Sequence, residues 1–163
     1  MTEEFRRTEF EQKIKMAQET RVSCYKDEKY ISALVKVEKL RAIDIRAAFL
    51  QSDELKREVF VKLPKDIEEE GVIWRLRKPL YGLTDAGRRF WLRVKKILEE
   101  NKFKKVTGDD AYYIKHDGHG VLIGQVILHV DDFMLAGTST FVTETTKMFQ
   151  STLTVSKIED DNF

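Results

Sequence analysis

The sequence predicts an α+β domain in which helices pack on one face of a sheet. Three observations lead to this prediction. Apolar runs of strand length alternate irregularly with helical patterns, so the chain lacks the strict strand–helix alternation of a parallel α/β fold. Residues 85–101 have a pronounced amphipathic helical pattern. Two apolar runs flank the adjacent acids Asp131 and Asp132, as the two strands of a hairpin would.

The composition indicates a soluble globular protein. The chain has 163 residues, of which 42% are hydrophobic and 35% are charged, and this suffices for one domain with a buried core. Its single cysteine, Cys24, excludes an internal disulfide, and no apolar run approaches the roughly 20 residues of a membrane helix. The first residues show no signal-peptide pattern. We therefore expect an intracellular protein, cytoplasmic or nuclear and not secreted, with no membrane partner.

The net charge of +1 gives the chain no general attraction to nucleic acid. Contact with nucleic acid would have to come from a local basic patch. One such patch lies within the predicted helix and consists of Arg88, Arg89, Arg93, Lys95 and Lys96. A basic helix face is more often only solvated, so contact with a nucleic-acid backbone is the second interpretation of this patch.

The first part of the chain is predicted to be a helical extension followed by the main domain. The extension covers residues 1–39 and contains a weakly amphipathic helix at 8–25, and the main domain covers 40–163. Residues 46–52 have the pattern of a helix, and an acidic loop is expected at 66–71. Short strands are predicted at 40–45, 58–63 and 72–76.

The second part begins with the amphipathic helix at 85–101. The apolar face of this helix consists of Phe90, Trp91, Val94, Ile97 and Leu98. A second helix is predicted at 140–150, with Thr138 or Ser139 as its cap. A hairpin turn is expected at 116–120. Strands are predicted at 111–115, 121–130, 133–135 and 152–155.

The aspartate pair points to metal chemistry. Asp131 and Asp132 are expected in a tight turn, where two negative charges repel and a divalent cation is the usual solution. Asp44 ends another predicted strand, and if that strand lies beside the hairpin, three carboxylates converge. They could then hold two Mg²⁺ ions about 4 Å apart, as in-line phosphoryl displacement requires. The simpler interpretations are ordinary turn chemistry for the pair and a helix cap for Asp44.

Three runs then occur in a characteristic order: Asp44-Ile45-Arg46-Ala47-Ala48-Phe49-Leu50, Lys78-Pro79-Leu80-Tyr81-Gly82-Leu83 followed by Ala86 and Arg88, and His129-Val130-Asp131-Asp132. Together they resemble the reverse transcriptase of copia-type (Ty1/copia) LTR retrotransposons. The resemblance covers roughly residues 40 to 158. It implies a polymerase palm with an antiparallel sheet and part of the fingers, and an RNA-directed DNA polymerase that uses two Mg²⁺ ions, with Mn²⁺ as a possible substitute.

The resemblance assigns the catalytic positions residue by residue. Asp44 matches the first catalytic aspartate, and the carbonyl of Ile45 is expected to help hold a metal ion. Asp131 matches the second aspartate that bridges the metals, and Asp132 matches the third, which is usually bound less tightly. The reaction implied is transfer of a nucleotidyl group from a dNTP to the 3′-hydroxyl of a primer.

The resemblance also assigns substrate-binding positions. Phe49 matches the aromatic residue under the deoxyribose, where its ring would exclude the 2′-hydroxyl of a ribonucleotide. Tyr81 and Gly82 match a segment that contacts the incoming nucleotide and the template, and glycine allows the backbone to come close. Arg88 would flank the template strand. The implied partners are an RNA or DNA template-primer, dNTPs and other parts of a retrotransposon polyprotein, which would supply the protease, integrase and RNase H.

The chain departs from the family pattern in several places. The family usually has Tyr at the position of His129, and Lys-Gln-Ala-Pro where this chain has Thr84-Asp85-Ala86-Gly87. Asp85 would place a negative charge near a template or triphosphate, which is unfavourable. Residues 1–39 lack the family's fingers pattern, and the sequence stops near Phe163, before the family's thumb. These departures suggest a truncated or decayed element.

Alternative interpretations therefore stay open. Phe49 alone is more often a core residue, the Tyr81-Gly82 pair is most often a simple turn, and His129 is more often a satisfied histidine than a metal ligand. At the level of the whole chain, the fold could survive without activity, as a module that binds nucleic acid or protein. A phospho-accepting receiver domain also has carboxylates at strand ends, but it needs a parallel sheet.

Overall fold

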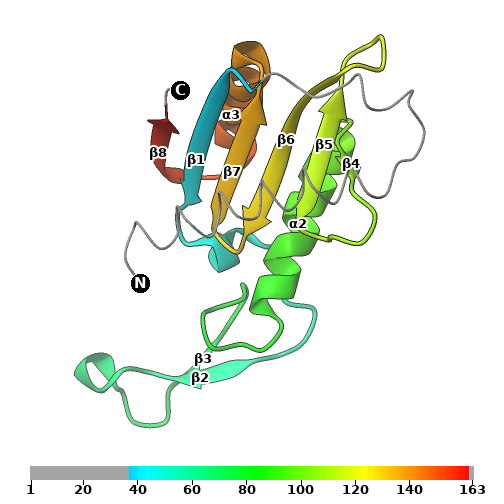
Figure 1. Ribbon diagram of the computed structural model, residues 1–163. Helices are drawn as coiled ribbons and strands as arrows, with labels where there is room; N and C mark the ends of the chain where they lie inside the picture. The colour runs from blue at the N-terminus through cyan, green and yellow to red at the C-terminus, as the bar shows by residue number, and fades with distance from the viewer. Residues whose placement is uncertain (1–36, 162–163) are drawn as a thin grey trace. The chain divides into compact units, whose positions relative to one another are not determined.

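A computed structural model describes residues 37–161 of the chain, which belong to one unit, residues 35–163. The expected helix at 8–25 lies outside the described residues. A six-stranded sheet in the order β4-β5-β6-β7-β1-β8 dominates the described part, and every neighbouring pair in it is antiparallel (Figure 1). Its strands are β1 (Lys39–Ile45), β4 (Lys104–Lys105), β5 (Tyr112–His116), β6 (Leu122–His129), β7 (Asp132–Gly137) and β8 (Val155–Asp161).

Two helices, α2 (Ala86–Glu100) and α3 (Ser139–Thr152), lie on the same face of this sheet, behind it in Figure 1. The arrangement confirms the predicted α+β architecture with an antiparallel sheet. The apolar face of α2 is also as predicted, since it buries Phe90, Val94, Ile97 and Leu98 and leaves Trp91 half-buried. The side chain of Thr138 accepts a hydrogen bond of 3.2 Å from the Phe141 N–H, which confirms it as the cap of α3.

An aromatic cluster joins both helices to the middle of the sheet. Phe133 of β7 is fully buried, and its ring centroid lies 6.2 Å from that of Phe90 on α2 and 5.0 Å from that of Phe149 on α3. Such aromatic pairs stabilise a core beyond the area they bury. The cluster holds the two helices against the strands that carry the acidic residues.

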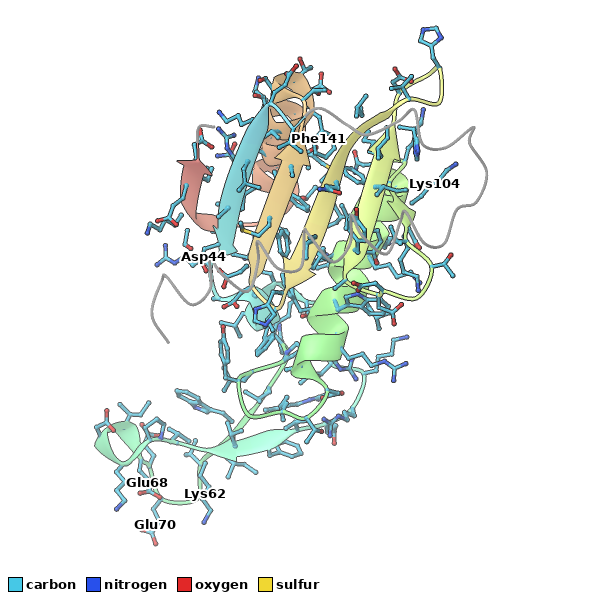
Figure 2. All side chains as sticks on the ribbon, in the orientation of Figure 1. Asp44, Lys62, Glu68, Glu70, Lys104 and Phe141 are labelled. Atoms are coloured by element: carbon cyan, nitrogen blue, oxygen red, sulfur yellow. The ribbon has the colours of Figure 1, made fainter. Side chains whose placement is uncertain are left out.

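Two glycines let α3 approach the sheet closely. Gly124 of β6 and Gly137 of β7 are paired in register. A Cβ atom at Gly124 would come within 2.1 Å of the Phe141 ring, and one at Gly137 would lie 2.5 Å from the backbone oxygen of Ile123. Figure 2 shows Phe141 at the end of the sheet opposite Asp44. Only glycine fits these two positions without displacing the ring or the neighbouring strand.

A separate two-stranded sheet is formed by β2 (Phe60–Lys62) and β3 (Ile73–Arg75), which pair antiparallel. The loop between them contains a short 3₁₀ helix, η3 (Lys65–Ile67). We call residues 58–76 the β2–β3 hairpin. Its strands were predicted with wider bounds, and the predicted acidic loop at 66–71 begins within η3.

The structure corrects several sequence-based expectations. Residues 46–52 form only a short 3₁₀ helix, η2 (Ala48–Gln51), whose N-terminal cap is Ala47; the interpretation of Asp44 as a helix cap is therefore wrong. The final strand is β8 at 155–161 rather than 152–155, because α3 continues to Thr152. The short strand β4 was missed. The antiparallel hairpin of β6 and β7 also rules out the parallel sheet that a receiver domain requires.

Candidate active site

The acidic residues meet at one end of the sheet. In the register of the antiparallel pairs, Asp44 of β1 lies opposite Asp132 of β7, and Asp132 lies opposite His129 of β6. Their neighbours Ile43 and Phe133 are buried against the helices, so alternation along the strands places Asp44 and Asp132 together on the other face. Side chains directly opposite each other in such a pair have Cβ atoms about 5 Å apart.

Asp131 joins this group through the turn between β6 and β7. The turn consists of Val130 and Asp131, since His129 and Asp132 are the last paired residues. The N–H of Ile45 donates a hydrogen bond of 2.8 Å to the carbonyl oxygen of Asp131. The strand that carries Asp44 is thus tied directly to the turn, and the three aspartates gather at one sheet end (Figure 2, where Asp44 marks it).

Two residues beside the aspartates have an unusual backbone conformation. Val130 has a φ of 55° and Ala47 has a φ of 47°, both in the left-handed region. A β-branched residue rarely adopts this region, and each such position costs on the order of 1–3 kcal/mol. The backbone at Ala47 is fixed by a 2.9 Å hydrogen bond that its carbonyl oxygen accepts from the Leu50 N–H. Strain of this kind persists only where the surrounding structure imposes it, here on both sides of the acidic group.

Ionisable residues form a row across the strands at this end of the sheet, with two acids in its middle. Lys157 of β8 is the register partner of Asp44, so a row of His129, Asp132, Asp44 and Lys157 crosses four strands. Two carboxylates in direct opposition destabilise a sheet. The ammonium group of Lys157, on the outer side of Asp44, forms an ion pair with Glu159. The carboxylate of Asp44 also accepts a hydrogen bond from the hydroxyl of Ser156.

The carboxylate oxygens at this end of the sheet are of the kind that Mg²⁺ prefers. Between residues 37 and 161, no three His, Cys, Asp or Glu side chains are already arranged as a metal cluster. Magnesium takes substrate phosphates and water together with one or two carboxylates, so a closed protein cage is not required. The donor set therefore fits Mg²⁺.

The structure also brings Phe49 and Tyr81 together. Phe49 lies in η2, four residues after Ile45, and packs partly against the core. Its ring centroid is 4.4 Å from that of Tyr81, with the ring planes at 48°. Tyr81 is exposed and lies in a turn, and Gly82 after it has a φ of 97°, which favours glycine. Two residues that the resemblance assigned to nucleotide binding from separate parts of the sequence are thus neighbours.

The expected conflict at Asp85 is offset by two arginines. Asp85 accepts hydrogen bonds of 2.8 Å from Arg89 and 3.0 Å from Arg57. The hydrogen bond from Arg89 is the main reason that the pKa of Asp85 lies below its usual range, and Arg57 adds to it. The negative charge that the sequence suggested would repel a template or triphosphate is therefore largely balanced within the protein.

The basic patch on α2 is mostly paired as well. Arg89, Arg93, Lys95 and Lys96 form ion pairs with Asp85, Asp53, Glu99 and Glu100 respectively. Arg88 is exposed on the first turn of α2 and forms no ion pair within the described residues. Of the patch, Arg88 is the residue best placed to attract a phosphate.

Sequence reasoning missed the contribution of β8 to this site. Ser156, Lys157 and Gln51 were not singled out, although each lies beside Asp44 or the loop that follows it. The alternating run Val155-Ser156-Lys157-Ile158 was the signal for a strand. Its high charge hid this signal, because an exposed edge strand has no continuous apolar face.

Within the described residues, no helix has the length and apolar character needed to cross a bilayer.

The chain is similar to Pol polyproteins of retrotransposons. It is 29% identical over 98 residues to the retrovirus-related Pol polyprotein from transposon TNT 1-94 of Nicotiana tabacum, and the match covers 58% of this chain and 7% of that protein. It is also similar to the Pol polyproteins from transposons RE2 and RE1 of Arabidopsis thaliana, with 28% identity over 104 residues and 27% over 101 residues, covering 62% and 60% of this chain.

The chain spans about 7% of the length of each of these relatives. The similarity to these three Pol polyproteins confirms the resemblance to copia-type retrotransposons. The family model described as reverse transcriptase (RNA-dependent DNA polymerase) matches residues 21–162. The match covers most of the chain, including all three runs on which the resemblance rested. This chain therefore belongs to the reverse transcriptase (RNA-dependent DNA polymerase) family.

Proposed function

We propose that this chain carries the palm-like catalytic part of a copia-type reverse transcriptase. It would transfer a nucleotidyl group from a dNTP to the 3′-hydroxyl of a primer, on an RNA or DNA template. One observation carries the proposal: the register of β1 and β7, with the hydrogen bond from Ile45 to Asp131, gathers three aspartates from distant parts of the sequence at one end of the sheet.

In this proposal, Asp44, Asp131, Asp132 and the carbonyl of Ile45 hold two Mg²⁺ ions, for which Mn²⁺ can substitute. When bound, the ions lower the pKa of the primer hydroxyl and neutralise charge on the departing pyrophosphate. The chain itself supplies the fixed oxygen ligands. The strained turn at Val130 and the hydrogen bond to Asp131 set the position of these ligands before any substrate arrives.

The aromatic pair of Phe49 and Tyr81 is the proposed nucleotide site. The centroids of the two rings are 4.4 Å apart, so the rings pack against each other and each supports the position of the other. A ring at the sugar discriminates dNTPs from NTPs by volume. Gly82 gives the backbone beside Tyr81 an open surface, and Arg88 offers a positive charge to the template.

The relatives are Pol polyproteins, and this chain corresponds to a small part of each. We therefore propose that other parts of such a polyprotein are its partners. The alternative function is a module that binds nucleic acid or protein without catalysis.

Primer extension on a homopolymer template, with Mg²⁺ or Mn²⁺, tests the proposal. The wild-type chain is expected to extend the primer, and Asp44→Ala and Asp131→Asn are expected to abolish extension because each removes a metal ligand. Asp66→Asn, in the exposed η3, is the matched control and should extend as the wild type does.

Measurable extension by Asp131→Asn would count against the assigned role of this aspartate. Retention of a labelled template-primer by the wild-type chain, without extension under either metal, would instead support the binding module.

A further inference from the structure

The β8 strand contains an irregularity directly beside Asp44. Lys157 pairs with Asp44, but Val155 pairs with Ile45, so Ser156 is an extra residue on β8 with no register partner. This is a β-bulge. Bulges change the direction of a side chain, and they are frequent next to active sites.

The bulge directs the Ser156 hydroxyl onto Asp44. The hydroxyl oxygen contacts Oδ2 of the Asp44 carboxylate and lies 3.1 Å from the Asp44 carbonyl oxygen. Both partners are acceptors and a serine hydroxyl carries one proton, so the hydroxyl acts as a donor to Asp44. A carboxylate that accepts such a bond has fewer accessible orientations than a free one.

A second set of hydrogen bonds fixes the position of the bulge. The side-chain amide of Gln51 donates 3.0 Å to the carbonyl oxygen of Thr154, and its oxygen accepts 2.7 Å from the Thr154 N–H. The same amide donates 2.6 Å to the Arg46 carbonyl oxygen, and the Arg46 N–H donates 3.0 Å to the Thr154 carbonyl oxygen. The start of β8 is thus locked to the loop that follows Asp44.

We propose that Ser156 is a positioning residue for the metal ligand Asp44, which it holds through Oδ2 so that Oδ1 is presented to a cation. This inference rests on the proposed function. The need for such a residue follows from the register, because Asp132 lies opposite Asp44 and the two carboxylates repel each other. Hydrogen-bonding partners of metal ligands typically set ligand orientation, and their loss weakens metal binding.

Binding of Mn²⁺ to the free protein, followed by electron paramagnetic resonance, tests this inference without any catalysis. The key comparison is Ser156→Thr against Ser156→Val, because the two side chains have the same shape and only threonine keeps the hydroxyl. Both residues favour strands, so both should fold. Ser151→Ala, an exposed serine on α3, is the control for loss of a surface hydroxyl.

We expect Ser156→Val to bind Mn²⁺ about three- to tenfold more weakly than the wild type. This is less than a buried partner would contribute, because Ser156 is exposed. Ser156→Thr and Ser151→Ala should bind as the wild type does. The concentration of Mg²⁺ that half-activates primer extension should rise by the same factor in Ser156→Val alone.

The outcomes separate the two proposals. If Asp44→Ala loses Mn²⁺ binding but Ser156→Val does not differ from Ser156→Thr, the role of Ser156 is wrong and the proposed function stands. If Ser156→Thr and Ser156→Val are equally weak, the effect comes from β8 as a strand, and the role of the hydroxyl is again wrong. If Asp44→Ala binds Mn²⁺ as the wild type does, both proposals fail.

Discussion

The six-stranded sheet and the β2–β3 hairpin are built from similar residues but have opposite environments. Both contain antiparallel strands of apolar and aromatic side chains. In β7, Phe133 and Leu135 are fully buried. In the hairpin, Phe60, Ile73 and Trp74 are 53%, 58% and 48% exposed. The difference lies in what covers each sheet: α2 and α3 pack on the first, and the apolar residues of the second remain on the surface.

The comparison shows that strand-like sequence alone does not stabilise a sheet. The hairpin is connected at its base by main-chain hydrogen bonds of 2.8 Å from Leu55 to Arg77 and from Leu76 to Val59. An isolated two-stranded hairpin is marginally stable in water, whereas the larger sheet gains stability from its aromatic core. We therefore expect the hairpin to open at lower free energy than the sheet.

Replacing one aromatic residue in each region should give the largest contrast. Phe133→Ala leaves a cavity between α2 and α3 and should lower the free energy of unfolding by about 3–5 kcal/mol. Trp74→Ala, at an exposed hairpin position, should change it by less than about 1 kcal/mol. Urea denaturation followed by circular dichroism measures both. Similar losses for the two variants would show that the hairpin is part of the cooperative core.

A methyl group at the junction of α3 and the sheet should give a somewhat smaller effect. Gly137→Ala places a Cβ atom against the backbone of Ile123, which cannot move aside easily, so we expect a loss of about 3 kcal/mol or less. Gly118→Ala is the matched control, since no atom lies within 4 Å of its Cβ position. Thermal unfolding of the two variants decides the point, and a melting temperature for Gly137→Ala equal to that of the control would contradict it.

The smallest contrast is expected between ion pairs. The ion pair of the six-stranded sheet should contribute slightly more to the free energy of unfolding than the ion pair of the hairpin, and this contribution should depend on pH. Arg41 forms a two-point contact with Asp160 across β1 and β8 and also donates 2.9 Å to the Thr146 hydroxyl. The hydrogen bond from Arg41 is the main reason that the pKa of Asp160 lies far below its usual range, and a hydrogen bond from Lys39 adds to the effect. In the hairpin, Arg75 and Glu58 are 3.1 Å apart and both largely exposed.

Because the folded pKa of Asp160 is depressed, its contribution is present above the unfolded value of about 4 and is lost as the pH falls below it. Asp160→Asn should cost about 0.5–1 kcal/mol at pH 7, a small value because the side chain is 34% exposed, and the difference should shrink below about pH 4. Glu58→Gln should have no measurable effect. Urea denaturation across this pH range provides the test, and a cost for Asp160→Asn that stays constant down to pH 2 would contradict the assignment.

The candidate site shows where sequence reasoning succeeded. The apolar runs around Asp131 and Asp132 predicted the hairpin, because two buried strands leave adjacent acids at the turn. The expectation that both acids lie in the turn was wrong for Asp132, which is the first residue of β7 and pairs with His129. The helix at 85–101 was predicted because its apolar residues recur at helical spacing. Both patterns are local in the sequence, and they are reliable because the apolar residues that form them are buried in the folded protein. By contrast, β8 and β4 were misplaced or missed, since their charged residues carry no such pattern, and only pairing with β1 and β5 makes them strands.

The sequence by itself determined the α+β class and the family, and it singled out Asp44, Asp131 and Asp132 as candidate site residues. This was possible because apolar periodicity and the order of motifs are properties of the linear sequence. The tertiary structure alone decided that Asp44 lies opposite Asp132, that Arg57 and Arg89 balance Asp85, and that Ser156 contacts Asp44. These contacts join residues far apart in the chain. They depend on strand register and on one bulge, and a shift of a single residue in either would place different side chains at the site.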